Sequence, residues 1–165
     1  MIHDIDIILS IIQSKVESIK ATGLSILTNS IDIANARIQF ENGAVASMTS
    51  SRIAKNKIRK VKIFQNKLYS TIDLLLGLTE IYQIKSYTKE RLKSSTNFLF
   101  EFDNKKKIIS YKKPIIKKED ALKMELINFI NSVMGKDTPI VNGFDGREAL
   151  KVAIQIQDSI MKDLK

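Results

Sequence analysis

An alternation of apolar and polar residues, broken once by Asn42-Gly43, constrains the fold of this chain more than any other feature. Small or apolar side chains occupy every second position up to Phe40, and a second strand-like run extends from Val45 to Ile53. A period of two places successive side chains on opposite faces of a strand. Asn-Gly is the preferred centre of a two-residue type I′ turn, because both of its positions need a positive φ. The segment therefore predicts a β-hairpin closed by a type I′ turn.

Strand-like runs continue beyond this hairpin and are separated by short turn-forming segments, which predicts an antiparallel meander in the same sheet. These runs are Lys60–Gln65, Leu68–Leu75 and Thr79–Ile84. Residues 86–96 are polar and lack a period, so a loop is expected there. The alternating Phe98, Phe100 and Phe102, followed beyond Asp103-Asn104 by Lys107–Tyr111, predict a second hairpin.

Helical periodicity marks both ends of the chain. A helix is expected from Asp4 to Gln13, and the β-branched segment Lys15–Thr28 after it is expected to be a strand. Past Pro114, a helix is expected to end at Gly135, and a last helix follows it. The apolar positions that define these two helices are Leu122, Leu126, Phe129, Ile130 and Val133, and then Ala149, Leu150, Ala153, Ile156, Ile160 and Leu164.

Strands in succession followed by helices, without β-α-β alternation, are typical of the α+β class. We therefore expect an open, mainly antiparallel β-sheet with helices packed on one face, in a single domain over residues 1–165. Helices can cover only one face of such a sheet, and large exposed apolar patches usually mark interfaces. A homodimer or tetramer formed face to face through the sheet is expected. The residues expected to divide between the two faces are Ala46, Met48, Ile63, Phe98 and Phe100.

The composition narrows the classes of protein. The chain has 27 Lys and Arg against 18 Asp and Glu, but only five of the 27 are Arg. Proteins that bind nucleic acid favour Arg for its bidentate fork, so a nucleic-acid partner is not expected. Cysteine is absent, no apolar run approaches the length of a membrane span, and Met1 to Asp6 is acidic where a signal peptide would be basic. We expect a cytoplasmic protein without a membrane partner.

The residues that usually build catalytic or cofactor sites are sparse. No two of the six glycines have the G-x-G spacing of a dinucleotide loop, so no cofactor-binding residue is assigned. His3 is the only histidine, and no metal site is expected. Asp4 and Asp6 lie where carboxylates complement the dipole of a helix N-terminus, which explains them without any catalytic role.

Three segments resemble a known family, in order and in spacing. They are His3–Leu9, Asp32–Ala46 running on to Arg52, and Pro139–Leu150. Together they resemble the C-terminal part of the Gfo/Idh/MocA family, named after glucose-fructose oxidoreductase and inositol dehydrogenase. Ala121-Leu122 with Glu125-Leu126 and Phe129 is similar to the penultimate helix of that family. The fold that this resemblance implies is the glyceraldehyde-3-phosphate-dehydrogenase-like C-terminal domain.

The resemblance also implies an activity, and it implies that this activity is divided between two domains. Members oxidise or reduce a sugar or cyclitol hydroxyl with NAD(P), which a Rossmann domain binds together with a catalytic Lys. This chain is similar to the second domain only, so it is expected to hold no cofactor itself. His3 matches the His of the family's D-x-x-x-H pattern and is the catalytic candidate, while Arg52 and Asp6 are candidates for binding the substrate. For His3 the plain alternative is a frayed terminal residue, and for Arg52 it is a strand-end charge.

Two functions therefore remain open. The first is the substrate-binding and oligomerisation domain of an NAD(P)-dependent sugar or nucleotide-sugar oxidoreductase, inactive without its Rossmann domain. The second is a free-standing, non-catalytic module that assembles with itself or with a full-length relative. Hydride transfer requires a nicotinamide ring at near-attack distance and a base for the hydroxyl proton, and an imidazole supplies only part of the second requirement.

Overall fold

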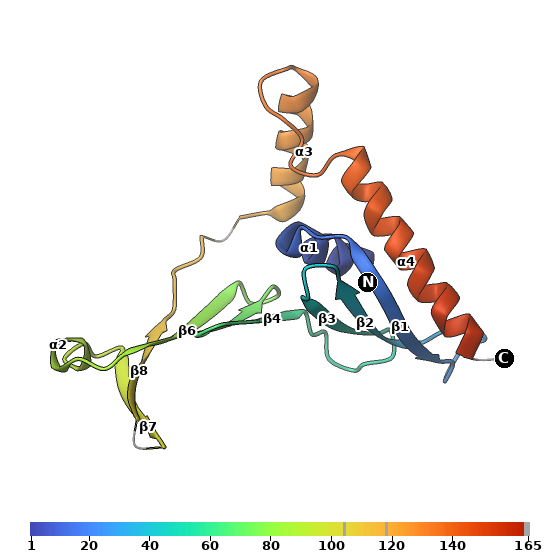
Figure 1. Cartoon of the computed structure of the whole chain (residues 1–165). Coiled ribbons are helices and arrows are strands. Elements are labelled where there is room, and N and C mark those ends of the chain that lie inside the picture. Colours follow the sequence, from blue (N-terminus) through green and yellow to red (C-terminus); the bar gives the residue numbers. More distant parts are fainter. Residues whose placement is uncertain (104, 118, 164–165) are drawn as a thin grey trace. The chain divides into compact units, whose positions relative to one another are not determined.

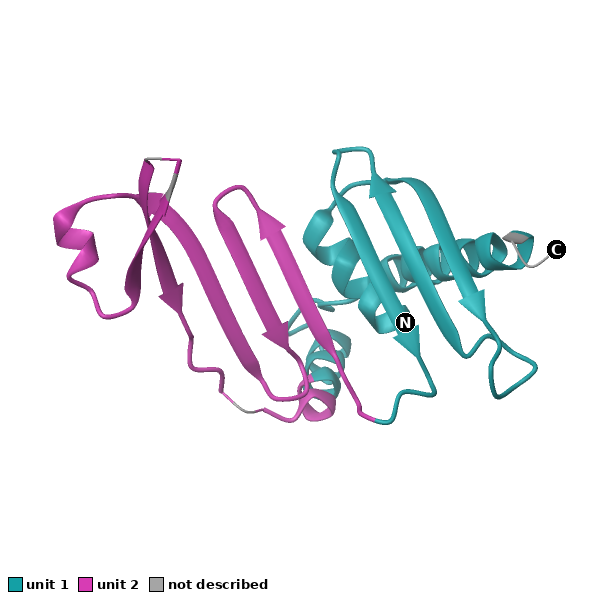
Figure 2. Ribbon diagram, turned by 90° about the horizontal axis from the view of Figure 1, so that it is seen from below, with its two compact units in different colours: residues 1–55, 125–165 teal, residues 56–124 magenta. Residues whose placement is uncertain are grey.

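The computed structural model describes residues 1–103, 105–117 and 119–163, which fold as two compact units. Unit 1 contains Met1–Lys55 and Glu125–Lys165, and unit 2 contains Asn56–Met124 (Figures 1 and 2). Each unit has its own antiparallel sheet. The predicted α+β class with open antiparallel sheets is confirmed, but the strands that the sequence assigns to one sheet are divided between two.

Unit 1 is a three-stranded sheet whose helices lie on one face (Figure 2). Its elements are α1 (Ile2–Ile12), β1 (Val16–Leu24), β2 (Ile33–Phe40), β3 (Val45–Ser51), α4 (Gly143–Asp163) and most of α3 (Ala121–Val133). The strands are ordered β1-β2-β3, and α4 packs against β1 and α1. The helices at both ends and the strand after α1 are confirmed. Leu164 lies outside the described residues.

The core of unit 1 follows from the alternation in β2. Ala36, Ile38 and Phe40 are buried, whereas Asn35, Arg37 and Gln39 between them are exposed. The buried row meets Ile5 of α1 and one face of α4. Ala46 and Met48 of β3 also pack against this core, so of the five residues expected to divide between two sheet faces these two lie on the covered face of unit 1. The α4 residues in the core are Ala149, Val152, Ile156 and Ile160.

Gly23 lets β1 and α4 approach closely. A Cβ atom at this position would lie 2.7 Å from Ile160 Cγ2 and 2.9 Å from Ile31 Cγ2. Gly23→Ala is therefore expected to lower the free energy of unfolding by about 1 kcal/mol or more through overpacking, measured by denaturant titration. Gly146→Ala in α4, whose Cβ would meet nothing within 4 Å, is the matched control and should be neutral or stabilising. Equal stability of the two variants would contradict the prediction.

The first hairpin is confirmed, but its predicted type I′ turn is wrong. Gly43 has a φ of 82°, whereas Asn42 is absent from the described residues with positive φ. The Gly43 N–H donates to Phe40 O at 2.9 Å, and the Asn42 side chain accepts from the Ala44 N–H at 3.0 Å. A turn of this kind needs left-handed geometry only at its glycine. The Asn42 side chain therefore stabilises the turn, and the Asn42 N–H donates to Ser14 Oγ at 3.2 Å.

Unit 2 is a five-stranded sheet with strand order β4-β5-β6-β8-β7, in which every neighbouring pair is antiparallel. Its strands are β4 (Lys60–Gln65), β5 (Leu68–Asp73), β6 (Leu78–Ser86), β7 (Asn97–Phe102) and β8 (Lys105–Lys112). The predicted meander and second hairpin are both confirmed. Asn104 of that turn, Lys118 and the side chain of Phe102 lie outside the described residues.

Two local contacts explain where unit 2 departs from the sequence-based expectations. β5 ends at Asp73 rather than at Leu75, because the Asp73 carboxylate accepts the N–H groups of Leu75 and Leu76 at 3.1 and 3.0 Å and turns the chain. The expected loop 86–96 contains a short helix, α2 (Lys89–Leu92). Thr88 caps this helix, since its Oγ1 accepts the Arg91 N–H at 3.2 Å.

Candidate functional site

The candidate catalytic histidine lies in the first turn of α1. His3 is exposed, while Ile5 two residues later is fully buried in the core of unit 1. Buried Ile5 fixes the orientation of the helix, and the helix presents His3 to solvent. His3 therefore has a regular helical backbone position in α1. Asp6 is half-buried on the same helix, and a spacing of three residues places its side chain next to that of His3.

Arg52 has a structural partner that sequence analysis did not identify. Its Nε lies 3.8 Å from Oδ1 of Asp32, and its Nη1 donates to Ser30 Oγ at 3.1 Å. Arg52 therefore ties the end of β3 to the loop that precedes β2. Among the described residues, no hydrogen bond or ion pair joins Arg52 to His3 or to Asp6. Its predicted role in substrate binding stays a prediction.

Asp32 is the organising residue of that loop. Its carboxylate is completely buried and accepts the N–H groups of Ile26, Leu27 and Thr28 at 2.8, 2.7 and 3.0 Å. The Thr28 hydroxyl donates a further hydrogen bond at 2.8 Å. The backbone N–H donors, that of Leu27 first, hold the pKa of Asp32 well below its usual range. Asp32 therefore remains ionised and closes residues 26–32 into a fixed loop.

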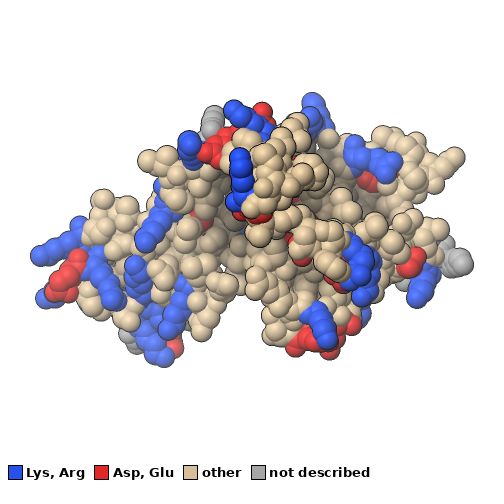
Figure 3. Space-filling model, turned by 90° about the horizontal axis from the view of Figure 1, so that it is seen from above, with Lys and Arg blue, Asp and Glu red and all other residues tan. Residues whose placement is uncertain are grey.

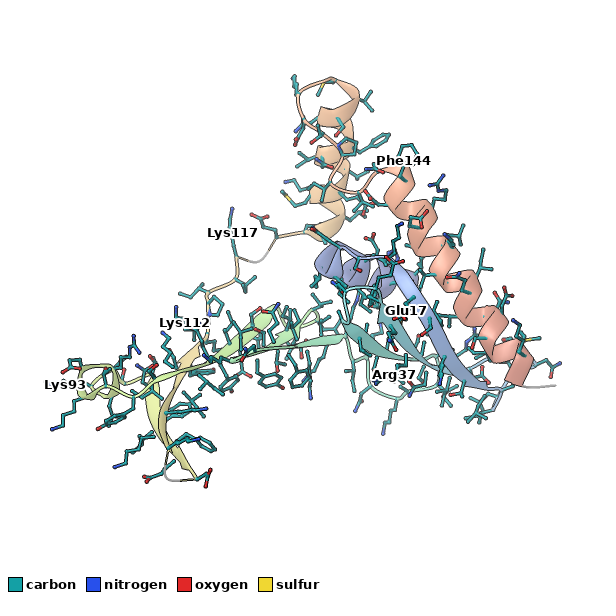
Figure 4. All side chains as sticks on the ribbon, viewed as in Figure 1. Glu17, Arg37, Lys93, Lys112, Lys117 and Phe144 are labelled. Carbon is teal, nitrogen blue, oxygen red and sulfur yellow. The ribbon has the colours of Figure 1, made fainter. Side chains whose placement is uncertain are left out.

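A large apolar surface surrounds α3 in unit 1. No residue of α3 is buried, and Phe144, labelled at the beginning of α4 in Figure 4, is 71% exposed. We call this the α3 surface. Its members are Leu126, Ile127, Phe129, Ile130, Val133, Met134, Ile140, Val141 and Phe144, each at least 40% exposed. Isolated exposed apolar residues are common, whereas a contiguous exposed apolar patch is typical of an interaction surface.

Asn128 fixes the two segments of the α3 surface against each other. Its Nδ2 donates to Thr138 O at 3.1 Å and to Asp137 Oδ2 at 3.3 Å, while its Oδ1 accepts the Ile140 N–H at 3.0 Å. One amide side chain thus holds the α3–α4 connection against α3. The sequence correctly predicts this helix, but not that its apolar side chains are left uncovered.

Unit 2 carries a row of aromatic side chains across four strands, which sequence analysis also missed. Phe64, Tyr69, Tyr82 and Tyr111 are successive cross-strand partners, with ring centroids 4.8, 5.8 and 5.1 Å apart. We call this the tyrosine row. The Tyr111 hydroxyl donates to Glu80 Oε1 at 2.9 Å, and this hydrogen bond, followed by burial, raises the pKa of Tyr111. Only the register of three strand pairs could have revealed the row.

Whether the described part of the chain has metal-ligand groups, membrane-spanning helices or clustered surface charge bears on what it can bind. Within residues 1–103, 105–117 and 119–163, no group of three His, Cys, Asp or Glu side chains is arranged to hold a metal ion. No helix there is both long enough and apolar enough to cross a membrane. On the face shown in Figure 3, Lys and Arg side chains are interspersed with uncharged and acidic ones and do not join into one basic band.

Two glycines, Gly143 and Gly146, lie in the first turn of α4, where the N–H groups that a phosphate would need already have partners. The Asn142 side chain already accepts the N–H groups of Phe144 and Asp145 at 2.8 and 3.2 Å. The Asp145 carboxylate accepts the Asn142 N–H at 2.9 Å and adds a negative charge where a phosphate would bind. The N–H donors of Phe144 and Asp145 are therefore already engaged within the chain.

Comparisons with known proteins match this architecture. A family model described as the GFO/IDH/MocA C-terminal domain matches residues 1–67. UDP-N-acetylglucosamine 3-dehydrogenase from Acidithiobacillus ferrooxidans is 25% identical over 160 residues, which cover 97% of this chain and 47% of that enzyme. A solved structure of that enzyme superposes with a TM-score of 0.82 at 24% identity, covering 100% of this chain and 47% of the enzyme.

More distant structures share the fold. A levoglucosan dehydrogenase solved with NADH and L-sorbose gives a TM-score of 0.74 at 14% identity, covering 98% of this chain and 46% of that one. The WlbA dehydrogenase from Bordetella pertussis, solved with NADH and UDP-GlcNAcA, gives 0.56 at 14% identity, with 98% and 41% covered. The chain thus spans about half the length of the relatives that it matches. Residues 1–67 thus match the C-terminal domain of the Gfo/Idh/MocA oxidoreductases, and nearly the whole chain is similar to one half of a nucleotide-sugar dehydrogenase.

Proposed function

We propose that this chain is the substrate-binding and oligomerisation half of an NAD(P)-dependent oxidoreductase acting on a sugar or nucleotide sugar in the cytoplasm. Catalysis requires a dinucleotide-binding half, which we call the partner half, carried by the same protein or by a separate chain. The observation that carries the proposal is the likeness of nearly the whole chain to one half of a nucleotide-sugar dehydrogenase.

His3 is the residue that we assign to proton transfer. Oxidation of a hydroxyl requires a base for its proton while hydride leaves the carbon, and imidazole exchanges a proton near neutral pH. The exposed position of His3 leaves it accessible to a substrate bound against α1. Asp6 would orient the substrate or the imidazole beside it. NAD(P), bound by the partner half, supplies the hydride acceptor.

Reconstitution tests this function directly. The chain alone should show no measurable NAD(P)H binding by calorimetry, whereas its fusion to the dinucleotide-binding half of the Acidithiobacillus enzyme should reduce NAD(P) with a nucleotide-sugar substrate. Micromolar binding of NAD(P)H by the chain alone would contradict the proposed division. A fusion that binds the cofactor but turns over no sugar or nucleotide sugar would contradict the substrate assignment.

The second candidate function is a non-catalytic assembly module, favoured by the exposed apolar surfaces of both units. The DNA upstream of the first codon separates the two candidates. A reading frame that encodes G-x-G-x-x-G and Glu-Lys-Pro supports the oxidoreductase half. Its absence, together with assembly of the purified chain into a defined oligomer, supports the module.

The α3 surface is the place where we expect the partner half to bind. Phe129→Ser should weaken association with a separately purified partner half about tenfold or more, because Phe129 is a large, 65% exposed side chain on α3. Lys136→Ser, outside the apolar cluster, is the control. Fluorescence anisotropy with a labelled partner half measures both affinities. Equal affinity of the two variants would remove the α3 surface from the interface.

Self-association is expected through the tyrosine row of unit 2. Phe64 is 74% exposed, and Phe98 and Phe100, 46% and 48% exposed, lie on the same sheet face by register. Ile63 lies on the opposite face. Sedimentation at tens of micromolar should show a dimer or tetramer, and Tyr82→Lys should shift it toward monomer, whereas Gln65→Lys should not. A monomeric parent chain would contradict the prediction.

A further inference from the structure

Two basic side chains face each other across the strand pair β1–β2. Lys20 and Arg37 are direct partners in the antiparallel register. Like charges placed directly opposite one another destabilise a sheet. Neither side chain forms an ion pair within the part of the chain that the structure describes. Buried Ala21, Ala36 and Ile38 alternate with them, so both basic side chains point away from the core, and Figure 4 shows Arg37 on the side of the sheet turned away from α1 and α4.

The pair borders an open depression of about 470 Å³, lined by hydrogen-bond donors. Thr22 and Asn35, the next cross-strand pair, contribute a hydroxyl and an amide. Ser159 of α4 accepts the Ala21 N–H at 3.1 Å, which leaves its hydroxyl hydrogen able to donate. The lining therefore combines two positive charges with neutral donors, and it includes no carboxylate.

The carboxylates nearby belong to a neighbouring depression. Glu17, Asp158 and Lys162 line that depression, which shares Ser159 with the first. Glu17 is already engaged, since it accepts a hydrogen bond from Gln39 Nε2 at 2.9 Å. Neither Glu17 nor Asp158 lines the depression beside Lys20 and Arg37.

We propose that Lys20 and Arg37 form a binding site for the phosphate group of a small molecule, separate from His3. A guanidinium recognises two phosphate oxygens at once through its planar fork, and an ammonium adds a point charge that tolerates many orientations. A bound phosphate would remove the repulsion between the two side chains, so binding and local stability are coupled. Thr22 and Asn35, on the same face of the strand pair, would donate to the remaining oxygens.

Titration of the whole chain with inorganic phosphate, UDP and uridine tests this site. Chemical-shift perturbation is measured at about 0.15 M salt, where charges more than about 8 Å apart are screened. Phosphate and UDP should both perturb the amides around Lys20 and Arg37, whereas uridine should not. The double variant Lys20→Gln with Arg37→Gln should bind phosphate and UDP about tenfold or more weakly than the parent chain. The affinity of Arg37→Lys should lie between those of the parent chain and the double variant.

A charge-matched control separates a site from general attraction to a basic chain. Lys15→Gln with Lys136→Gln removes two charges from the same unit and should change the affinity by less than about twofold. Equal weakening in both double variants, no saturable perturbation by phosphate, or uridine binding as well as UDP would overturn the proposal. If the Lys20 and Arg37 changes alter only the sedimentation of the chain, the pair serves a contact between copies and the proposal is wrong.

Discussion

Replacement of His3 by alanine in the reconstituted enzyme is expected to lower turnover about 10²-fold or more, the contribution typical of a positioned acid or base. The structure gives this residue no packing role, because its side chain is exposed while Ile5 anchors α1. The loss should therefore fall on turnover while the unfolding temperature stays unchanged. Steady-state kinetics of NAD(P)H formation measures the effect.

Ser10 provides the matched control for His3 on the same helix. It is exposed, and its hydroxyl only donates back to Ile7 O at 2.8 Å, so Ser10→Ala should leave turnover intact. Asp6→Asn should raise KM or lower turnover by less than His3→Ala, since Asp6 is assigned to orientation. A fused His3→Ala enzyme that loses less than about tenfold in turnover would remove His3 from the mechanism.

The second large effect is expected at Asp32. Asp32→Asn should lower the melting temperature by roughly 5 °C or more, because a neutral amide replaces an acceptor of several charge-assisted hydrogen bonds and one of its two terminal atoms cannot accept. The Thr28 and Leu27 N–H groups would lose their strongest partner, and Arg52 would lose its counterion. Thermal unfolding followed by circular dichroism measures the change.

The pH dependence of this difference has a definite sign. The pKa of Asp32 is lower in the folded chain than the value of about 3.9 usual for an unfolded one, so the unfolded state binds a proton first as the pH falls. The stabilisation from Asp32 is therefore complete above about pH 5 and declines as the pH falls through 4 toward the folded value. The melting temperatures of the parent chain and of Asp32→Asn should therefore converge as the pH falls. A difference in melting temperature that stays constant from pH 7 to pH 3, or an equal difference for the exposed control Asp158→Asn, would contradict this account.

The sequence predicts elements whose signal is local and misses features that depend on distant residues. The alternation through Phe40 is enough to predict β2 and β3, because each strand alone shows which of its side chains share a face. It cannot show that eight strands form two sheets, since strand pairing is settled by contacts between segments. The predicted turn type is wrong for a similar reason, because the Asn42 N–H donates to Ser14, which lies in the distant connection between α1 and β1.

The residues of the candidate site also divide into those that a local sequence signal reveals and those that depend on distant contacts. His3 and Asp6 were identified through the resemblance, which depends on short segments that sequence alone displays. Arg52 stays a predicted substrate-binding residue, and its structural partner could not be predicted, because Asp32 lies 20 residues away and its burial depends on a folded loop. The exposure of the α3 surface could not be predicted, since amphipathic periodicity does not reveal whether a covering partner lies in the same chain.

The hydrogen bonds of Asn128 have a consequence for how two halves of an enzyme could meet. Since this side chain fixes residues 137–140 against α3, the apolar side chains on both segments are presented together before any partner arrives. Association between preformed surfaces requires little ordering of the chain, and ordering is one of the main costs of binding. The same rigidity that leaves these side chains facing water in the isolated chain would let two separately synthesised halves bind without a change in the conformation of this surface.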